Sequence, residues 1–219
     1  MITLRVSEVF TSIQGEGPSV GTPSVFVRLQ GCAVGCAWCD TRYSWSAAGG
    51  RETTLAALLA EVKAGAAGNV VVTGGEPLEH PAFVPLIRGL REPGRRIEVE
   101  TAGTEVPPAV PVDQWNVSLK LAHSGVPEAR RLRPAAVERF RDLGAWFKFV
   151  VGDERDVAEV QALQARFSLA PERILLMPLG MRREEQVARM PEVVEWCGRH
   201  GFRFSPRLHI LLWGPKRGV

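Results

Sequence analysis

The chain alternates between short runs with the twofold alternation and β-branched residues of strands and longer runs with the apolar spacing of helices. Strand-like runs cover residues 4–13, 23–30, 69–73, 95–101, 114–120, 145–151 and 173–177. Helix-like runs cover residues 53–65, 81–91, 134–143, 154–167 and 184–200, and Thr53 or Thr54 caps the first of them. Repeated strand–helix units of this kind predict an α/β fold with a parallel sheet, open or closed into a barrel.

The length of the chain limits how far such a sheet can close. At 219 residues it lies near the upper end of usual one-domain lengths, so we expect a single domain over residues 1–219. Eight full strand–helix units would not fit into this length, which predicts an incomplete, partial TIM-like barrel of mostly parallel strands with outer helices. In such sheets ligands bind at the carboxyl ends of the strands.

Charge and hydropathy exclude several classes of protein. The 27 basic and 24 acidic residues give a formal net charge of +3 and are scattered along the chain, so we expect no nucleic-acid partner. A small or acidic ligand suits this balance better. The chain has no apolar run of roughly 18 residues and no secretory signal at its start, so we expect a cytoplasmic protein with no membrane partner.

Three of the four cysteines, Cys32, Cys36 and Cys39, form a Cys-x3-Cys-x2-Cys run directly after a strand-like segment. This spacing is too tight for a disulfide framework, and in a reducing cytosol it indicates metal. Three thiolates can bind three irons of a 4Fe-4S cluster and leave the fourth iron open. A structural zinc site would need a fourth ligand, whereas Cys197 and the histidines are distant in sequence. We expect Cys197 to be a small buried residue near a helix end.

A second motif, Thr73-Gly74-Gly75-Glu76-Pro77, follows the strand predicted over residues 69–73. Glycines at the end of a strand let the backbone approach a ligand that side chains would exclude. Taken alone, the motif is a strand-to-helix turn.

The run over residues 31–41 resembles the radical S-adenosylmethionine superfamily, in which an aromatic residue commonly precedes the last cysteine, as Trp38 does here. The resemblance implies that S-adenosylmethionine binds the open iron through its amino and carboxylate groups. It also implies that one electron from the cluster breaks a carbon–sulfur bond and that the resulting radical abstracts hydrogen from a substrate. In this superfamily a Gly-Gly-Glu-Pro turn contacts the S-adenosylmethionine amino group.

Four further motifs resemble the 7-carboxy-7-deazaguanine synthase family: residues 14–17 (Gln-Gly-Glu-Gly), 39–41 (Cys-Asp-Thr), 100–103 (Glu-Thr-Ala-Gly) and the ending 213–219. They extend from the first predicted strand to the last residue. The resemblance implies conversion of 6-carboxy-5,6,7,8-tetrahydropterin into 7-carboxy-7-deazaguanine, a queuosine precursor, with loss of ammonia. S-adenosylmethionine is then used catalytically, magnesium is required, and the substrate undergoes hydrogen abstraction at C6, ring contraction, hydrogen return and elimination.

By matched position, the resemblance implies roles for individual residues around the catalytic cysteines. The substrate pocket would contain Ile13, Gln14, Gly15, Glu16, Arg28, Thr73, His209 and Val219. Arg28 would pair the substrate carboxylate, for which its fork of donors is suited. The S-adenosylmethionine site would contain Trp38, Gly75, Glu100, Ser118, Leu119, Lys120, Met177, Pro178, Leu179 and Gly180. Thr41 would bind Mg²⁺, which prefers hard oxygen ligands.

Two positions depart from the family pattern, since Leu119 stands where many relatives have proline and Met177 where many have glutamine. The family also implies a homodimer and a flavodoxin-like reductant. Two other functions stay open: a radical S-adenosylmethionine activase that generates a glycyl radical on a partner protein, and a non-catalytic metal-binding module. The activase would not explain the motif at residues 14–17, and the module would leave the glycine motif without a purpose.

Overall fold

A computed structural model describes residues 1–91 and 94–219 and contains one curved sheet, of nine strands in the described part of the chain. The strands are β1 (Thr3–Ile13), β2 (Pro23–Leu29), β3 (Arg51–Thr54), β4 (Asn69–Gly74), β5 (Arg96–Thr101), β6 (Gln114–Val117), β7 (Trp146–Val151), β8 (Ile174–Pro178) and β9 (Arg203–Phe204). Their order is β3-β1-β2-β4-β5-β6-β7-β8-β9. β1 is antiparallel to β2 and β3, and every pair from β2 to β9 is parallel.

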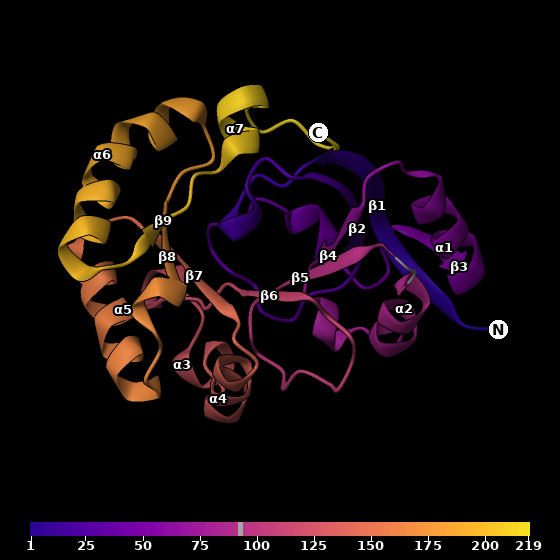
Figure 1. The fold of residues 1–219 in the computed structure, drawn as a ribbon, viewed down its shortest axis with the longest axis horizontal. Helices are drawn as coiled ribbons and strands as arrows, with labels where there is room; N and C mark the ends of the chain where they lie inside the picture. Colours follow the sequence, from indigo (N-terminus) through magenta and orange to yellow (C-terminus); the bar gives the residue numbers. More distant parts are fainter. Residues whose placement is uncertain (92–93) are drawn as a thin grey trace.

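Most of the helices cover the outside of this sheet. The helices are α1 (Leu55–Ala64), α2 (Phe83–Leu90), α3 (Glu128–Arg131), α4 (Pro134–Asp142), α5 (Glu154–Phe167), α6 (Arg183–His200) and α7 (Leu208–Trp213). Figure 1 shows the sheet as an arc from β1 to β9, with α1 to α6 on its outer side. α7 and the C-terminus lie on the open side, between the two ends of the arc. The predicted partial barrel of mostly parallel strands is confirmed.

The main core lies between the sheet and the outer helices. Val70, Val71 and Val72 on β4 are all fully buried, as expected for a parallel strand that is covered on both faces. Phe140 on α4 and Phe147 on β7 are among the largest fully buried side chains. The continuous apolar runs of the sequence therefore form this core, and the strand ends are left for polar residues.

Several short elements differ from the sequence prediction. The strand predicted over residues 114–120 ends at Val117, so residues 118–120 lie in the loop that follows it. The helix predicted from residue 53 begins at Leu55, where Thr54 Oγ1 caps it by accepting from Ala57 N at 3.2 Å. The preceding residues form β3 instead. β3, β9, α3 and α7 are each too short for a periodic pattern, and the sequence did not predict them.

Candidate active site

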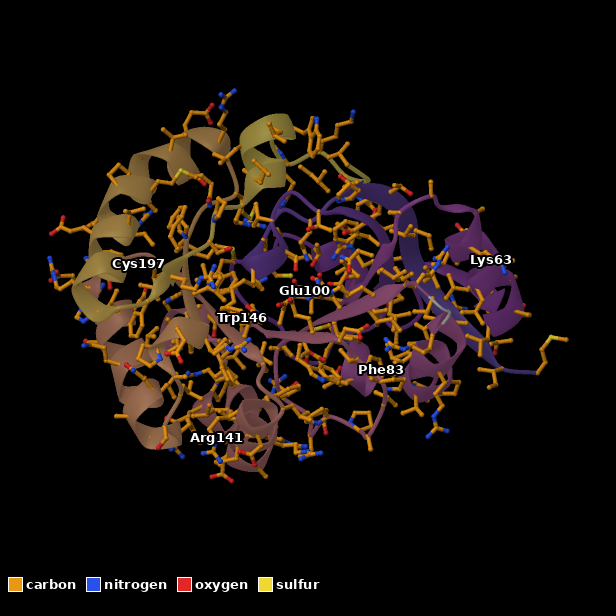
Figure 2. All side chains as sticks on the ribbon, viewed as in Figure 1. Lys63, Phe83, Glu100, Arg141, Trp146 and Cys197 are labelled. Carbon is orange, nitrogen blue, oxygen red and sulfur yellow. The ribbon has the colours of Figure 1, made fainter. Side chains whose placement is uncertain are left out.

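A cavity of about 240 Å³ opens at the carboxyl ends of the parallel strands. Arg28 from β2, Thr73 from β4, Glu100 from β5 and Met177 from β8 all line it. Figure 2 shows Glu100 near the centre of the molecule and Cys197 in the outer helical layer. The cavity thus occupies the position in which a sheet of this class binds its ligands.

The three clustered cysteines are free thiols that line one side of this cavity. Cys36 is buried, whereas Cys32 and Cys39 are partly buried and pack against an apolar cluster that includes Val126. Burial raises the pKa of Cys32 to about 11 and also raises the pKa of Cys36. Because a thiol must lose its proton to ligate, these groups become thiolates only when a metal centre displaces the proton.

Backbone hydrogen bonds fix the cysteine loop on both sides. Gly31 N donates to Ser44 O at 2.8 Å, and Cys32 N donates to Trp45 O at 3.1 Å. The indole Nε1 of Trp45 donates to Cys39 Sγ at 3.2 Å. Trp45 also lines the cavity, and the sequence analysis did not identify it. It supplies a hydrogen bond to the sulfur of a predicted cluster ligand, and hydrogen bonds of this kind adjust the potential of an iron–sulfur centre.

The glycine turn after β4 packs directly against the start of the cysteine loop. A Cβ atom at Gly75 would lie 2.1 Å from Gly31 O and 2.6 Å from Cys32 Cβ, so only glycine fits there. Glu76 N donates to Gly31 O at 2.9 Å. Gly75 therefore allows a close contact between two backbone segments, and the approach of this turn to a ligand stays a prediction.

The side chain of Glu76 turns away from the loop and joins β4 to β5. Its carboxylate accepts hydrogen bonds from Thr101 Oγ1 at 2.6 Å, Ala102 N at 2.6 Å and Leu78 N at 3.0 Å. Burial raises the pKa of Glu76 to about 7, against the opposing effect of these three donors. Within the described residues Glu76 is a buried acid with no cation among its hydrogen-bond donors, and these bonds join the turn to the end of β5.

The residues around the cysteines fit an iron–sulfur cluster with a ligand beside it. The donor set is three thiols next to one cavity, and each thiolate of a cubane cluster binds a different iron. Among the described residues no three His, Cys, Asp or Glu side chains converge as they would around a single metal ion. Trp38 lines the cavity, and its buried Nε1 has no hydrogen-bond partner in the described part of the chain. Such an orphaned donor suits a site that a ligand completes.

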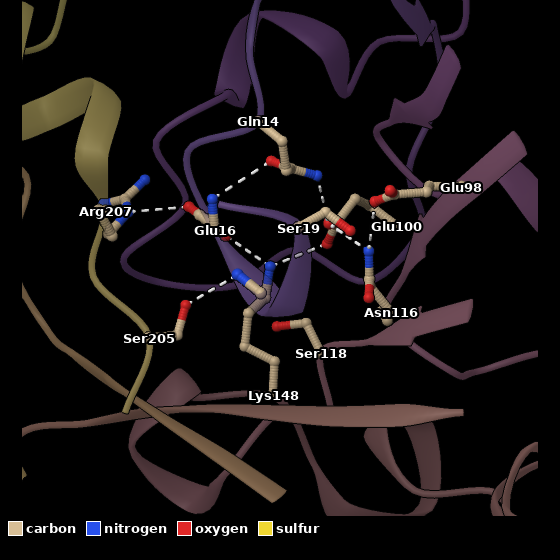
Figure 3. A network of polar contacts seen from close by, with 12 residues as sticks. Gln14, Glu16, Ser19, Glu98, Glu100, Asn116, Ser118, Lys148, Ser205 and Arg207 are labelled. Atoms are coloured by element: carbon tan, nitrogen blue, oxygen red, sulfur yellow. Dashed lines mark hydrogen bonds and ion pairs between the residues drawn. The ribbon is translucent and has the colours of Figure 1, made fainter. Parts of the chain in front are cut away.

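Across the cavity lies a network of charged side chains, shown in Figure 3. Lys148 Nζ on β7 contacts Glu16 Oε2 at 2.5 Å and Glu100 Oε2 at 2.8 Å. Gln14 links the same two acids, since its Nε2 donates to Glu100 Oε1 at 3.2 Å and its Oε1 accepts from Glu16 N at 3.2 Å. These residues come from the loop after β1, from β5 and from β7.

Burial and neighbouring charges set the ionisation of this network. Burial alone would raise the pKa of Glu16, but Lys148 and Arg207 bring it well below its usual range. Burial would likewise lower the pKa of Lys148, but Glu100 and Glu16 bring it above its usual range. The pKa of Glu100 is raised, because burial outweighs the attraction of Lys148. Glu16 is the more firmly ionised of the two acids.

Arg207, just before α7, joins this network to the cysteine loop. Its Nε donates to Glu16 Oε1 at 3.1 Å, and its Nη2 donates to Asp40, the residue next to Cys39. Its side chain is 9% exposed, so its contact with Glu16 is largely shielded from water, whereas Asp40 is partly exposed. One guanidinium thus holds the loop after β1 and the loop that carries the cysteines.

The other predicted substrate residues lie around the same network. A Cβ atom at Gly15 would lie 2.3 Å from His209 Nδ1, so the packing of α7 requires a glycine there. Burial lowers the pKa of His209. Arg28 Nε donates to Glu8 Oε1 at 2.7 Å, and this bond orients the guanidinium on the cavity wall. Val219, the last residue, also lines the cavity.

The cavity brings most of the predicted site residues together. Lining residues among them are Ile13, Gln14, Gly15, Glu16, Arg28, Cys32, Cys36, Trp38, Cys39, Thr41, Thr73, Gly75, Glu100, Ser118, Lys120, Met177, Leu179, Gly180, His209 and Val219. Leu119 and Pro178 do not line it. Leu119 is 1% exposed and packs into the main core, and Pro178 turns its carbonyl to Gln186 Nε2 at 2.8 Å. The side chain of Leu119 therefore lies in the core, and Pro178 is not part of the cavity wall.

Lys148, Arg207, Asp40 and Trp45 are among the lining residues to which the sequence assigned no role. Lys148 carried a signal, since it is a lone charge within an apolar strand-like run, and such residues are seldom buried unless paired. Asp40 and Trp45 are near the cysteines in sequence. Arg207 lies in a segment without any periodic pattern, and nothing marked it.

Comparisons with known proteins agree with this geometry. The model of the radical SAM superfamily matches residues 26–147. The chain is 40% identical to the 7-carboxy-7-deazaguanine synthase of Pyrobaculum aerophilum over 98% of this chain and 97% of that protein. It is 39% identical to the same-named protein of Hyperthermus butylicus over 97% and 94% of the two chains.

Among solved structures, the crystal structure of QueE from Escherichia coli matches with a TM-score of 0.77 and 29% identity, over 95% of this chain and 96% of that one. Within the described residues, no helix combines the length and the apolar character needed to cross a membrane. The matches cover nearly the whole of both chains, from the cysteine loop to the charged network. The chain therefore belongs to the 7-carboxy-7-deazaguanine synthase family of the radical S-adenosylmethionine superfamily.

Proposed function

We propose that this chain converts 6-carboxy-5,6,7,8-tetrahydropterin into 7-carboxy-7-deazaguanine, with loss of ammonia. Family membership supports this reaction. The observation that carries it is that one cavity is lined both by the three-cysteine loop and by the charged network around Glu16. One side thus suits a cofactor, and the other suits a polar substrate.

At the cofactor end, Cys32, Cys36 and Cys39 would hold the 4Fe-4S cluster. The cluster with bound S-adenosylmethionine supplies a carbon radical that abstracts hydrogen from the substrate. Gly75 lets the turn after β4 pack against the loop that would hold the cluster, because a side chain there would strike Cys32. Trp38 has a buried N–H that can donate a hydrogen bond to a ligand. Lys120, whose Nζ lies 5.4 Å from the centre of the Trp38 ring, adds positive charge.

At the substrate end, each side chain has a binding task that suits its chemistry. Glu16 and Gln14 offer an acceptor and an amide to the polar edge of a pterin. Arg28 is oriented by Glu8 through Nε, so its two Nη groups can bind a carboxylate. His209 is buried with a lowered pKa, so it remains neutral and does not compete for that carboxylate as a cation.

Further features of the family extend the proposal. Thr41 would bind Mg²⁺ beside the cysteine loop, where its Oγ1 lies 3.5 Å from Cys39 Sγ. We also propose that residues 1–219 act as one catalytic domain, that two copies form a homodimer in the cytoplasm, and that a flavodoxin-like protein is the reductant.

A single reaction tests the proposal. The protein is reconstituted anaerobically with iron and sulfide, reduced, and incubated with 6-carboxytetrahydropterin, S-adenosylmethionine and magnesium, and the products are read by mass spectrometry. We expect a deazaguanine acid, ammonia and unconsumed S-adenosylmethionine. Cleavage of S-adenosylmethionine without this acid would refute the proposed substrate, and absence of a cluster would refute the radical chemistry.

A further inference from the structure

Lys148 is the centre of the polar network and has no role in the family pattern described above. Its side chain is 5% exposed, and its Nζ contacts carboxylates from two separate elements, Glu16 in the loop after β1 and Glu100 on β5. A charge is costly to bury in this way unless it is paired, and two carboxylates pair with it here. The position of Lys148 on the rigid strand β7 fixes where both carboxylates lie.

We propose that Lys148 is a positioning residue that holds the Glu16 carboxylate ionised on the cavity wall, where it selects a substrate edge with two N–H donors. The inference rests on the proposed pterin reaction and assigns the recognition of the pterin ring to this pair. Lys148 acts through Glu16.

The position of the Glu16 carboxylate depends on Lys148. Glu16 lies in the loop after β1, and its carboxylate is held by Lys148 and Arg207. Glu16 and Glu100 contact the same Nζ atom, so without that cation the two carboxylates would repel each other. Removing Lys148 would therefore both displace Glu16 and favour its protonation.

Each carboxylate oxygen of Glu16 keeps an acceptor site for a ligand. A carboxylate has about four lone-pair sites on its two oxygens. Lys148 takes one site on Oε2 and Arg207 takes one on Oε1, so one site remains on each oxygen. Two parallel N–H donors can fill such a pair of sites, as a guanidinium fork does. In a pterin, the 2-amino group and N3–H are two such donors on one edge.

The groups around Glu16 keep its carboxyl ionised. The groups that face it are Lys148 from β7 and Arg207 and His209 from the segment of α7. Glu100 lies across Lys148 and Asp40 across Arg207. The two cations outweigh burial and the other acids, so the pKa of Glu16 is well below its usual range. Glu16 therefore stays an acceptor throughout the neutral and mildly acidic range.

Two ligands that differ at one position test this selectivity. One is 6-carboxypterin, and the other is 6-carboxylumazine, in which an oxygen acceptor replaces the 2-amino donor. Their dissociation constants are measured by titration with the cluster-loaded protein in the presence of S-adenosylmethionine, for the wild-type chain and for Lys148→Met. The matched control is Lys63→Met on α1, a lysine that does not line the cavity.

We expect the wild type and Lys63→Met to bind 6-carboxypterin more tightly than 6-carboxylumazine. Lys148→Met should lose about tenfold or more of that preference, because a displaced Glu16 carboxyl no longer discriminates against the 2-oxygen of the lumazine. The iron and sulfide content of Lys148→Met equals that of the wild type, because the contacts of Lys148 are to Glu16 and Glu100 and not to the cysteine loop. Lys148→Arg, which keeps the charge, restores part of the preference.

Equal preference in Lys148→Met and wild type overturns the inference, while the proposed reaction stands. A wild type that fails to bind 6-carboxypterin overturns the proposed reaction itself. A second measurement needs no variant. The wild-type preference should be constant from about pH 6.5 to about pH 5.5, because Glu16 remains ionised and both ligands keep their N3–H over this range. A loss of preference toward the acid end of this range would also overturn the inference.

Discussion

The two ends of the cavity are built in opposite ways. At the cysteine end, the three predicted cluster ligands lie within eight residues of one loop, and backbone hydrogen bonds hold that loop among apolar side chains. At the substrate end, the charged groups lie far apart in sequence. Glu16 is 132 positions from Lys148 and 191 from Arg207, and ion pairs hold these side chains together. The first end is a local motif, and the second exists only in the folded chain.

The two ends also treat buried carboxylates differently. Glu76, at the cysteine end, accepts only neutral donors, and burial raises its pKa to about 7. Glu16, at the substrate end, has two cations beside it, and its pKa falls well below the usual range. The protonation of Glu76 therefore changes near neutral pH, whereas Glu16 stays an anion. The neighbouring charge decides which of the two it is.

The largest effect should come from removing one cluster ligand. Cys36→Ala leaves two thiolates for the cluster, so we expect bound iron and sulfide near background and no detectable cleavage of S-adenosylmethionine. Iron analysis and product chromatography measure this. The control is Cys197→Ala, which removes a buried thiol from α6 and should keep the cluster. A Cys36→Ala protein with full iron content would show that the cysteine end does not depend on its local motif.

At the substrate end, removal of one cation should affect stability strongly. Arg207→Gln leaves Glu16 and Asp40 without this partner, so the free energy of unfolding should fall by about 2–4 kcal/mol, less than for a fully buried pair because Asp40 is partly exposed. The control is Arg199→Gln, which breaks two exposed pairs on α6 and should change stability by less than about 1 kcal/mol. Anaerobic denaturation measures both. Equal effects would mean that the Arg207 pairs behave as surface pairs.

The contrast between the two buried glutamates predicts a pH dependence. The pKa of Glu76 is about 7 in the folded chain against an ordinary value of 4.5, so protonation is favoured by folding. Its contribution to stability is complete below pH 4.5 and is lost as the pH rises through about 7. The free energy of unfolding should therefore fall by about 3 kcal/mol more in wild type than in Glu76→Gln over this interval. Parallel pH profiles of the two proteins would contradict this.

A smaller effect should follow from filling the contact between the glycine turn and the cysteine loop. Gly75→Ala forces a Cβ atom to within 2.1 Å of Gly31 O, and such overpacking typically costs about 1–3 kcal/mol. We expect a lower midpoint of thermal unfolding and faster loss of iron. In Gly198→Ala, on α6, the added Cβ meets nothing within 4 Å, so this control should be neutral or more stable. Equal behaviour of the two variants would show that the turn can yield.

The sequence predicted the order of strands and helices well where their patterns were long. The apolar run Asn69–Thr73 and the helix pattern over residues 154–167 correspond to β4 and α5 within a residue. Short elements such as β9 and α7 were missed, because two to six residues carry no detectable period. α7 matters for the site, since it carries His209 onto Gly15.

By itself, the sequence determined the cysteine end of this protein. Cys32, Cys36 and Cys39 could be identified because their spacing is a local feature of the chain, and Gly75 could be identified because it follows a strand-like run closely. Only the tertiary structure decided the substrate end. Lys148 stands in the sequence as a lone charge in an apolar strand, and its two acidic partners are brought to it by the curvature of the sheet and the loop after β1. The physical reason is that an ion pair depends on distance in space, and a linear pattern does not contain that distance.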